Sequence, residues 1–418
     1  MAQEILSIGD TGQQLVNKFN GNFSSLFFAP LYFIENYAEE GDVDDTLAFQ
    51  RCIDAMPDTT SFQSGGGIIM LSGKKYVISD TILCDKSIKI MGAGSDSGTM
   101  IWMPAQSNCN MFEFGKRNSS DPISVHLIGM RIGMDVNQTG ACSNVVCYNY
   151  LRHSHFMDLF IAGATAANFR MIVDNEGGTS ARNSYFYGCA FEYGKVRALD
   201  IVHGYNLNIN SCYFGFGTDN DSWGLYIDQT APRLVVSNCW FLQDSQRGNL
   251  FITGATYVHV VNNHFSGIDG VAILGSSHIY IGTCAVVQIS GNTFANTLYP
   301  YAIRVAAEST SAVKIHDNFF GSVATAYFLF ATKANVICHD NTFFTGLQNN
   351  KGLATIANGQ TYVEVTHGIF TTPDSVFTTP RGNEAVWVSD IGATVFRINR
   401  AGSSGDLVCN WLSSIATY

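Results

Sequence analysis

The stretches "LVVSNCWFLQ" (234–243), "VHVVNNHFSG" (258–267) and "VVQISGNTFAN" (286–296) are three versions of one sequence pattern. Each begins with alternating apolar residues, continues with a Cys or Asn and one variable position, and reaches a Phe. Because successive side chains of a β-strand point to opposite faces, the pattern predicts a strand, a bend at the Cys or Asn, and a short second strand through the Phe.

The Phe of this pattern recurs along the chain from residue 191 onward. Successive anchors are 23, 27, 24, 29, 26, 23 and 27 residues apart, at Phe191, Phe214, Phe241, Phe265, Phe294, Phe320, Phe343 and Phe370. Such a period is typical of solenoids, in which each unit buries its apolar face against its neighbours. The unit has no helical pattern, and a third strand such as "NLFIT" (249–253) follows the Phe. We therefore predict an all-β parallel β-helix with the Phe side chains inside, stacked at about the 4.8 Å strand spacing.

The residue two positions before each anchor forms a second column, which consists of Cys189, Cys212, Cys239, Asn263, Asn292, Asn318 and Asn341. Asn tolerates a left-handed backbone at a bend and can bond its own main chain. Stacked amides can also form a ladder between coils. The three cysteines are expected to be unpaired thiols that fill small apolar spaces, because stacked parallel side chains do not give the near-perpendicular torsion of a disulfide.

Composition excludes several classes of protein. The 418 residues include 40 Gly and 29 Phe but only 14% charged residues, which is typical of a turn-rich β protein. A net charge of −11 disfavours a nucleic-acid partner, which needs clustered Lys and Arg. The eleven Cys show no CxxC or metal spacing, so neither a disulfide framework nor a metal or cofactor is expected. The start "MAQEILSIGD" lacks a signal-peptide pattern, so we expect a protein that stays in the cytosol or is exported without a signal peptide. No apolar run is long enough to span a bilayer, so membrane insertion is not expected.

The upstream third carries the repeat more faintly. "IKIMGAG" (88–94), "VHLIGMRIGM" (125–134) and "SHFMDLFIAG" (154–163) are interpreted as further coils with longer loops between them. Before them, "DVDDTLAFQRCIDAMP" (42–57) predicts a helix that ends before Pro57.

This helix is expected to cover the open first coil, because an exposed β-helix end is an unpaired edge that promotes aggregation. Asp44 or Asp45 would cap its N-terminus. Its apolar residues Phe49, Ile53 and Met56 share one face.

At this point the chain resembles a known family. "GDVDDTLAFQRCIDA" (41–55), followed by "GGGIIMLSGKKYVIS" (65–79) and "IKIMGAG", is similar to the entry segment of the pectate-lyase-like right-handed β-helices of bacteriophage tailspikes and related carbohydrate-active proteins. The chain departs from that pattern at Leu71, where the family usually has Pro, in one added residue before Tyr76, and in a shortened Asp-rich turn. The resemblance implies a right-handed parallel β-helix, and it implies a receptor-binding protein of a phage tail, assembled in the host cytoplasm.

The two ends add to the resemblance. "IGDTGQQLVNKFNGNFSSLF" (8–27) is amphipathic at helical spacing and is similar to segments that attach tail fibres and spikes to the virion. "ATVFRINRAGSSGDLV" (393–408) resembles the β region that follows a fibre's receptor-binding part. Such a strand-rich tail is too short to bury a hydrophobic core alone, but three copies packed together could bury one. This predicts a homotrimer.

These observations divide the chain into four parts, which are a virion-attachment segment (1–40), a capping helix and entry to the β-helix (41–110), the parallel β-helix (111–370) and a trimerisation-like C-terminal β region (371–418).

Candidate sugar-binding residues come from the variable position of the repeat. This column contains Ala190, Tyr213, Trp240, His264 and Thr293, on the side opposite the buried Phe. Rings in a row suit the apolar faces of sugars, so Tyr213, Trp240 and His264 are candidate substrate-binding residues. Alternatively, a long loop or a neighbouring subunit covers them.

Carboxylates near this column are candidates for glycosidic cleavage, because hydrolysis uses one protonated and one ionised carboxyl group. Glu192 and Asp244 are the first pair, helped by Asp219 or Asp221. Two coils separate Glu192 from Asp244, about 10 Å by strand spacing, which favours an inverting hydrolase over a retaining one. If Asp219 or Asp221 instead partners Glu192, the separation shrinks and a retaining mechanism is expected. Alternatively, these residues only form turns.

Two further groups are secondary candidates. Asp200 and Asp228 are expected to point outward from the third strand of their coils. "RHSHFMD" brings together residue types that could serve a lyase as base and charge neutraliser, or form a surface or subunit contact, namely Arg152, His153, His155 and Asp158. His316 and His339 occupy a repeated position before an Asp and are interpreted as scaffold.

The sequence thus predicts a homotrimeric tailspike or receptor-binding protein that recognises a bacterial surface polysaccharide and depolymerises it, with hydrolysis favoured and elimination by a lyase left open. The alternative is a non-catalytic β-helical adhesin or structural virion fibre. A suitable carboxylate pair beside the aromatic column would favour the enzyme, and its absence would favour the adhesin.

Overall fold

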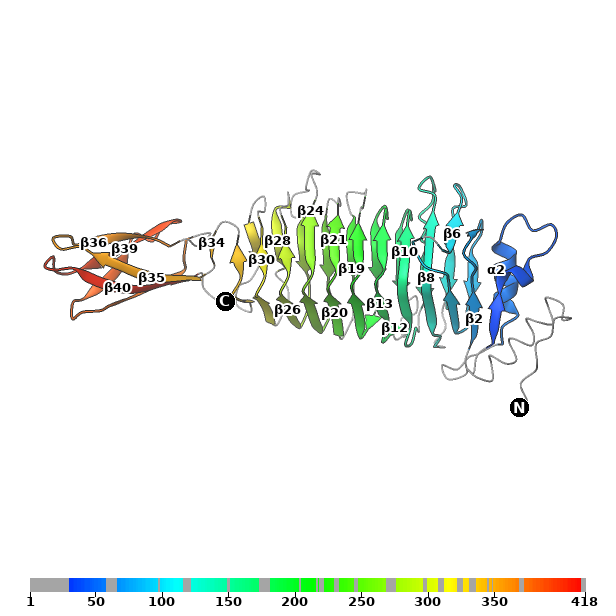
Figure 1. Cartoon of the computed structure of the whole chain (residues 1–418), viewed down its shortest axis with the longest axis horizontal. Helices are drawn as coiled ribbons and strands as arrows, with labels where there is room; N and C mark the ends of the chain where they lie inside the picture. Colours follow the sequence, from blue (N-terminus) through cyan, green and yellow to red (C-terminus); the bar gives the residue numbers. More distant parts are fainter. Residues whose placement is uncertain are drawn as a thin grey trace, which may run out of the picture.

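The computed structural model shows a rod of stacked coils with a separate β region beyond its last coil (Figure 1). It describes residues 30–57, 66–96, 98–115, 122–148, 151–172, 181–202, 204–215, 217, 222–228, 233–243, 247–267, 276–295, 299–306, 312–321, 326–330, 336–343, 346–347, 349–367 and 372–414. Within these residues, no helix is both long and apolar enough to cross a membrane.

Each complete coil contributes three strands, two to the 22-stranded sheet A and one to the ten-stranded sheet B. The first strip of sheet A contains β1 (Leu31–Phe33), β2 (Gly67–Met70), β5 (Ile88–Met91), β13 (Tyr185–Tyr187), β17 (Leu207–Asn210), β20 (Arg233–Ser237), β23 (Tyr257–Val261), β26 (Val286–Ser290), β29 (Ala312–His316) and β32 (Val336–His339). The second strip contains β3 (Lys75–Val77), β6 (Met100–Met103), β14 (Ala190–Glu192), β18 (Tyr213–Gly215), β21 (Trp240–Gln243), β24 (His264–Gly267), β27 (Thr293–Phe294), β30 (Phe319–Phe320) and β33 (Thr342–Phe343). Two long strands belong to both strips, β8 (Val125–Met134) and β10 (His155–Ala162).

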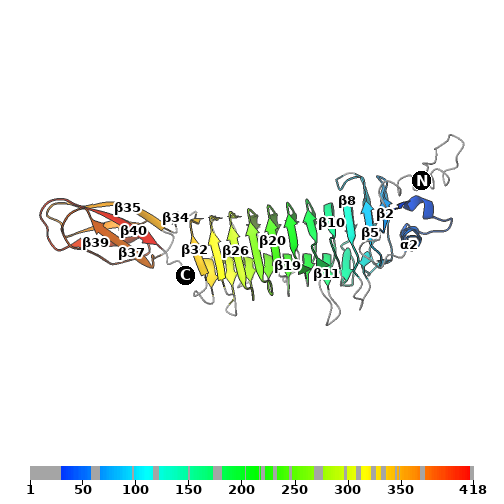
Figure 2. The same cartoon turned by 90° about the horizontal axis from the view of Figure 1, so that it is seen from below.

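Sheet B forms the third side of the coils (Figure 2). Its strands are β4 (Ile82–Cys84), β7 (Phe112–Phe114), β9 (Val145–Tyr148), β11 (Ala167–Ile172), β15 (Arg197–Ile201), β19 (Trp223–Ile227), β22 (Gly248–Ile252), β25 (Ser277–Ile281), β28 (Tyr301–Val305) and β31 (Ala326–Phe330). A small additional pair joins β12 (Ala181–Arg182) to β16 (Gly204–Tyr205). Every pairing between coils in sheets A and B is parallel and in register, for example Phe214 with Phe241 and Leu225 with Leu250. The parallel β-helix expected from the repeat is confirmed.

The Phe anchors form the predicted internal stack. Neighbouring rings lie 4.7 to 5.3 Å apart between centroids, with interplanar angles of 5° to 12°. The stacked and fully buried rings are those of Phe191, Phe214, Phe241, Phe265, Phe294 and Phe320. Parallel strands in register hold the same side chain at the same place in each coil, so one residue type fills the core repeatedly. The side chain of Phe343 and all of Phe370 lie outside the described residues.

The Cys and Asn column is also buried, and its Asn members form a ladder. The side-chain amide of Asn263 donates to Asn292, that of Asn292 to Asn318, and that of Asn318 to Asn341, over 2.9 to 3.0 Å. The cysteines of the column are unpaired in the structure. The expected left-handed bend, however, falls one residue earlier, at Gly188, Ser211, Asn238, Asn262, Gly291, Asp317 and Asp340. The ladder residue itself points inward, because its amide satisfies the carbonyl groups at the corner of the coil.

The N-terminal end is covered by the predicted helix, α2 (Thr46–Asp54), which follows the 3-10 turn η1 (Ile34–Tyr37) (Figure 1). Its apolar face is buried as expected, and Phe49 packs edge-on against Tyr76 with centroids 5.6 Å apart. Asp44 accepts a hydrogen bond from the Thr46 amide, over 2.8 Å. Asp45 instead accepts one from the Val77 amide at 2.7 Å, and so ties the helix to β3.

The segment expected to end at residue 40 does not stay separate from the sheet. Residues 1–29 lie outside the described residues, but Leu31 to Phe33 already pair in parallel with β2. The solenoid therefore begins about ten residues before the expected boundary at residue 41, because these apolar residues complete its first edge.

The C-terminal β region follows the last coil (Figure 1). Parallel pairing ends at β33, which pairs antiparallel with β34 (Gly346–Leu347). Two antiparallel three-stranded sheets follow, built from β35 (Asn349–Ile356), β36 (Tyr362–Thr366), β37 (Ser375–Pro380), β38 (Val386–Ser389), β39 (Val395–Arg400) and β40 (Leu407–Ser414). The region therefore begins before the expected residue 371, because β35 and β36 already belong to it. The later boundary was expected because Phe370 lies at the spacing of the repeat.

Candidate functional site

The predicted aromatic column lies on the outer face of the second strip of sheet A. Tyr213, Trp240 and His264 are in register on neighbouring coils. Trp240 is 53% exposed and meets the His264 ring edge-on, with centroids 5.1 Å apart. Tyr213 and His264 are half-buried. The structure thus brings the three predicted sugar-binding residues together, with the Trp240 indole accessible to a ligand.

Glu192 lies at the end of β14, one coil before Tyr213. Its carboxyl group is half-buried, and desolvation raises its pKa above the usual range while the nearby Arg131 guanidinium opposes the shift. Arg131 itself is stacked over the Phe160 ring at 4.4 Å. A carboxyl group with a raised pKa is suited to donate a proton to a leaving group.

The other predicted carboxylates, Asp219, Asp221 and Asp244, lie outside the described residues. Their distances from Glu192 and the inverting geometry therefore stay predictions. In the sequence, Asp221 precedes Trp223 by two residues and Asp244 precedes Arg247 by three.

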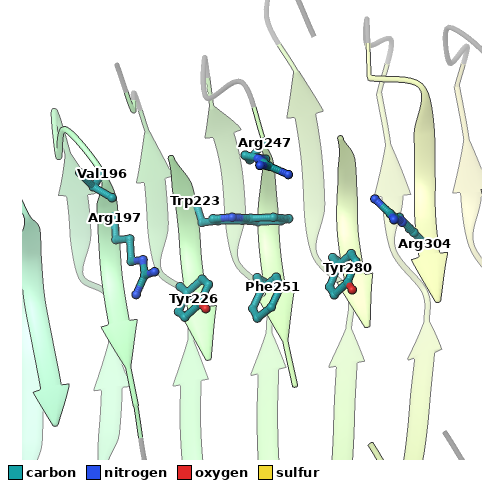
Figure 3. A pocket seen from close by; sticks show the side chains of 8 residues that line it. All are labelled: Val196, Arg197, Trp223, Tyr226, Arg247, Phe251, Tyr280 and Arg304. Atoms are coloured by element: carbon teal, nitrogen blue, oxygen red, sulfur yellow. The ribbon is translucent and has the colours of Figure 1, made fainter. Parts of the chain in front are cut away.

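A second concave surface, the sheet B groove, was not expected from the sequence. It has a volume of ≈ 490 Å³ and lies on the outer side of sheet B (Figure 3). The residues that line it are Val196, Arg197, Trp223, Tyr226, Arg247, Phe251, Tyr280 and Arg304. They come from β15, β19, β22, β25 and β28 and from the residues just before β15 and β22.

The floor of the sheet B groove is a row of stacked rings. Tyr226, Phe251 and Tyr280 occupy the same outward position on β19, β22 and β25. Their ring centroids are 4.4 and 4.8 Å apart, with interplanar angles of 4° and 3° (Figure 3). In-register pairing of parallel strands produces such a row wherever successive coils carry an aromatic residue at one position.

Trp223 forms a wall of the sheet B groove. Its indole meets Phe251 edge-on with centroids 5.2 Å apart, and extends toward Tyr280, 6.3 Å away. Gly248 makes this position possible, because a Cβ atom there would lie 2.6 Å from the indole and 2.1 Å from the Ser277 carbonyl oxygen. The glycine therefore shapes the groove.

Arginines surround the rings. The Arg197 guanidinium lies over the Tyr226 ring at 3.5 Å and donates to Asp200 over 2.7 Å. Arg304 lies over the Tyr280 ring at 5.3 Å. Arg247 is placed above Trp223 in the view of Figure 3.

Asp200, expected to be an outward carboxylate, is instead buried between two arginines. Arg197 and Arg170 approach its two oxygens at 2.7 and 3.0 Å. It faces outward from its strand, but the two side chains cover it, so it serves as an anchor for Arg197 rather than as an accessible acid. Asp228 lies beside the groove, where the Tyr226 hydroxyl approaches it at 3.5 Å.

The lyase candidates are only partly brought together. His155 lies outward on β10 between His126 and Tyr185, with ring centroids 5.0 and 5.1 Å away. His153 precedes the strand with a left-handed backbone (φ 50°), so it does not share a strand face with His155. Asp158 lies at the bend of β10 and accepts a hydrogen bond from Ser95 over 2.8 Å.

The pair His316 and His339 stack at 5.0 Å between centroids, and each contacts the Asp that follows it, at 2.7 and 2.8 Å. This repeated corner is consistent with the scaffold role expected from the sequence. In the part of the chain that the structure describes, no three His, Cys, Asp or Glu side chains gather into a metal site.

Comparison with known proteins identifies the fold. No protein-family model matches the chain. No curated protein sequence matches it either. Among solved structures, the ORF18 protein of Geobacillus virus E2 is similar over 95% of this chain and 80% of its own, with a TM-score of 0.62 and 15% identity. The tailspike protein of Acinetobacter phage vB_ApiP_P1 is similar over 91% and 86% (TM-score 0.56, 10% identity).

A third similar structure is tailspike protein gp49 of Acinetobacter baumannii bacteriophage Fri1, a capsular polysaccharide depolymerase. The similarity covers 92% of this chain and 86% of that one, with a TM-score of 0.52 and 12% identity. At such identities the likeness concerns the fold alone. It does not transfer a site.

Proposed function

We propose that this chain is a bacteriophage tailspike that binds a bacterial surface polysaccharide along the outer side of its β-helix. The observation that carries the proposal is the sheet B groove, a concave surface lined by four aromatic side chains from three successive coils. Pockets lined by aromatic residues and a few polar groups are typical ligand sites. The outward edges of the stacked rings give the groove an apolar floor against which the CH groups of a sugar can lie, while its hydroxyl groups bond to polar neighbours.

The fold supports the same proposal. Two of the similar structures are tailspike proteins, and one of them is a capsular polysaccharide depolymerase. In this chain, the residues before β1 would attach the spike to the phage tail, and the C-terminal β region would hold three chains together.

We further propose that the protein cleaves the polysaccharide by hydrolysis. Glu192 lies on the coil that continues into Val196 and Arg197 of the sheet B groove, and its raised pKa suits a general acid. Asp244, Asp219 or Asp221 would supply the second carboxylate. The alternative, an adhesin that binds without cleavage, is favoured if the polysaccharide is bound and remains intact.

The test is to incubate the protein with purified surface polysaccharides from a panel of bacteria and to analyse any fragments by mass. A fragment that has gained water indicates hydrolysis, whereas an unsaturated sugar indicates elimination. The binding of whole polysaccharides is measured in parallel by surface plasmon resonance.

Two variants separate the candidate surfaces. Trp223→Ala removes the wall of the sheet B groove and is expected to weaken polysaccharide binding at least tenfold. Trp240→Ala tests the sheet A column in the same way. Tyr257→Ala is the matched control, since Tyr257 is as exposed as Trp240 but lies on the first strip. If no polysaccharide binds, or if both Trp variants bind as well as the parent protein, the proposal is wrong.

A further inference from the structure

We infer that the C-terminal β region carries a second glycan-binding site, which takes a neutral sugar chain on the outer face of the β36–β39–β38 sheet (Figure 1). The inference goes beyond the proposed function, because the site lies outside the β-helix and uses neither the sheet B groove nor the aromatic column of sheet A. We call this surface the β39 face. Its outward residues are Tyr362, Glu364, Trp387, Ser389, Arg397 and Asn399.

Alternation along β39 decides which side chains the β39 face presents. Phe396 and Ile398 are fully buried in the core between the two antiparallel sheets. Because successive side chains of a strand point to opposite sides, Arg397 and Asn399 lie on the outer side. Strand pairing then places the outward residues of β36 and β38 beside them.

Two exposed aromatic residues lie at the ends of one row across the β39 face. Tyr362 pairs with Asn399, which pairs on its other side with Trp387. Two strand spacings, about 10 Å, therefore separate the backbones of Tyr362 and Trp387. Trp387 is 51% exposed and Tyr362 is 44% exposed. Because the Arg397 guanidinium lies over the Tyr362 ring at 4.8 Å, Trp387 is the residue on which a sugar ring would pack.

A series of hydrogen bonds restrains the polar side chains between the two rings. Arg397 donates to Glu364 over 2.8 Å and to Asp390 over 3.0 Å. Ser389 also donates to Asp390, over 3.2 Å, and Asn399 donates to Ser389 over 2.9 Å. These side chains are thus ordered before a ligand binds, which reduces the entropy that binding costs.

Charge and hydrogen-bonding capacity indicate a neutral ligand. Arg397 is paired with both Glu364 and Asp390, so these three groups together carry a net negative charge, which disfavours an acidic sugar. Carboxylate oxygens are acceptors, and Asn399 uses its NH₂ group for Ser389 and the Trp387 carbonyl, so its oxygen is the group that can accept from a ligand. Sugar hydroxyl groups can donate to these acceptors.

The opposite face of the C-terminal β region is better suited to contact another copy of the chain. It exposes the apolar side chains of Leu353, Phe377 and Leu412. If copies associate through that face, the β39 face of each copy stays accessible. Several weak sites then bind a repeating polysaccharide more tightly than one site does.

The experiment applies the full chain to an array of neutral and acidic oligosaccharides derived from bacterial surface polysaccharides. The double variant Trp223→Ala/Trp240→Ala serves as the starting protein, because both candidate surfaces of the β-helix are altered in it. Each oligosaccharide that binds is then titrated by isothermal titration calorimetry. We expect at least one neutral oligosaccharide to bind the double variant, with an affinity that changes little as salt is added.

Further variants assign this binding to the β39 face. Adding Trp387→Ala to the double variant should weaken binding at least tenfold, whereas Trp387→Phe should retain part of the affinity because it keeps an aromatic ring. Tyr257→Ala is the control, since Tyr257 is as exposed as Trp387 but lies on β23 of the β-helix. Thermal melting verifies that each variant is folded, and light scattering measures its mass.

The inference is wrong if the double variant binds no neutral oligosaccharide, or if adding Trp387→Ala leaves the affinity unchanged. It is also wrong if Trp387→Ala lowers the mass, because the β39 face would then be a contact between chains. None of these outcomes overturns the proposed function, whose test is the dependence of whole-polysaccharide binding on Trp223 and Trp240. The two failures are therefore distinguishable.

Discussion

Asn292 donates a hydrogen bond from its side-chain amide to the side-chain oxygen of Asn318 on the next coil, over 2.9 Å. The same amide donates to the Val260 carbonyl at 2.8 Å, and its own oxygen accepts from the backbone and side chain of Asn263. One side chain therefore joins three coils inside the solenoid. Because all of these groups are buried, each depends on the others for its hydrogen bonds.

Asn292→Ala is expected to lower the free energy of unfolding by about 2–4 kcal/mol, because it leaves buried donors of Asn263 and the Val260 carbonyl unsatisfied. Urea unfolding followed by circular dichroism measures this change. Lys314→Ala, an exposed residue on β29, should shift the transition only slightly. Equal effects of the two substitutions would contradict a stabilising role of the ladder.

Glu192→Gln is expected to reduce cleavage of the polysaccharide by a factor of about 10²–10⁴ while its binding is retained, because the amide cannot donate the proton of a general acid. The raised pKa of Glu192 adds a pH dependence, since the protonated form is the active one. Activity should therefore fall as the pH rises through that raised pKa. Reducing-end assays over a pH series measure both effects. The control is Glu40→Gln, at an exposed site near the capping helix, which should keep full activity. If Glu192→Gln cleaves the polysaccharide at the rate of the parent protein, Glu192 is not the general acid.

Stability should fall in mild acid because of His278, which is fully buried beside Phe265, Phe294 and Tyr299. Desolvation lowers its pKa to about 3, from an ordinary value of 6.5. As the pH falls below 6.5, this histidine becomes protonated in the unfolded chain but stays neutral in the folded chain. The free energy of unfolding therefore decreases progressively down to about pH 3. At pH 4.5 this linkage amounts to about 3 kcal/mol.

The measurement is urea unfolding at pH 7.5 and pH 4.5. His278→Gln, in which the amide can still bond to Asn249, is expected to reduce the difference between the two pH values, even if the protein is less stable at both. His259→Gln, on the outer face of β23, is the control. A pH dependence that is identical in His278→Gln and the parent protein would rule out His278 as its source.

Homotrimer formation is expected through the C-terminal β region. Leu353, Phe377 and Leu412 are exposed on one face of the β35–β40–β37 sheet, opposite its buried Cys409 and Trp411. An exposed apolar face of this kind is typical of a surface covered by another chain. Light scattering should therefore give three times the 45.6 kDa chain mass.

Phe377→Glu is expected to dissociate the trimer or weaken it by placing a charge in the contact. Val43→Glu, which introduces the same charge at an exposed residue near the cap, should leave the mass unchanged. A monomer mass for the parent protein at micromolar concentration would show that the face is not a trimer contact.

Features that recur at a constant offset could be predicted from the sequence. The buried Phe stack and the Asn column follow each bend directly, so their positions in the coil are fixed by local spacing. The backbone conformation of single residues was harder to predict. The left-handed bend lies at Asn262 rather than Asn263, because the inward Asn is needed for the ladder and its neighbour can take the strained position.

The sheet B groove was missed because its signal is spread over loops of different length. Tyr226, Phe251 and Tyr280 lie 12, 10 and 15 residues after Phe214, Phe241 and Phe265, so they align only once the coils are superimposed in space. The position of the Trp223 side chain could not be predicted from the sequence of its own strand, because it depends on Gly248 of the next coil. Contacts between coils that differ in sequence need the three-dimensional structure.

The in-register stacking of the coils also governs how such a molecule can change in size. Because each coil contacts only the coils on either side, a whole coil could be added or removed in the middle of the rod while the pairing pattern of the others is kept. Such a change would shift the C-terminal β region along the axis by about 4.8 Å per coil. The length of the rod and the chemistry of its groove can therefore change independently, provided that α2 still covers the first coil.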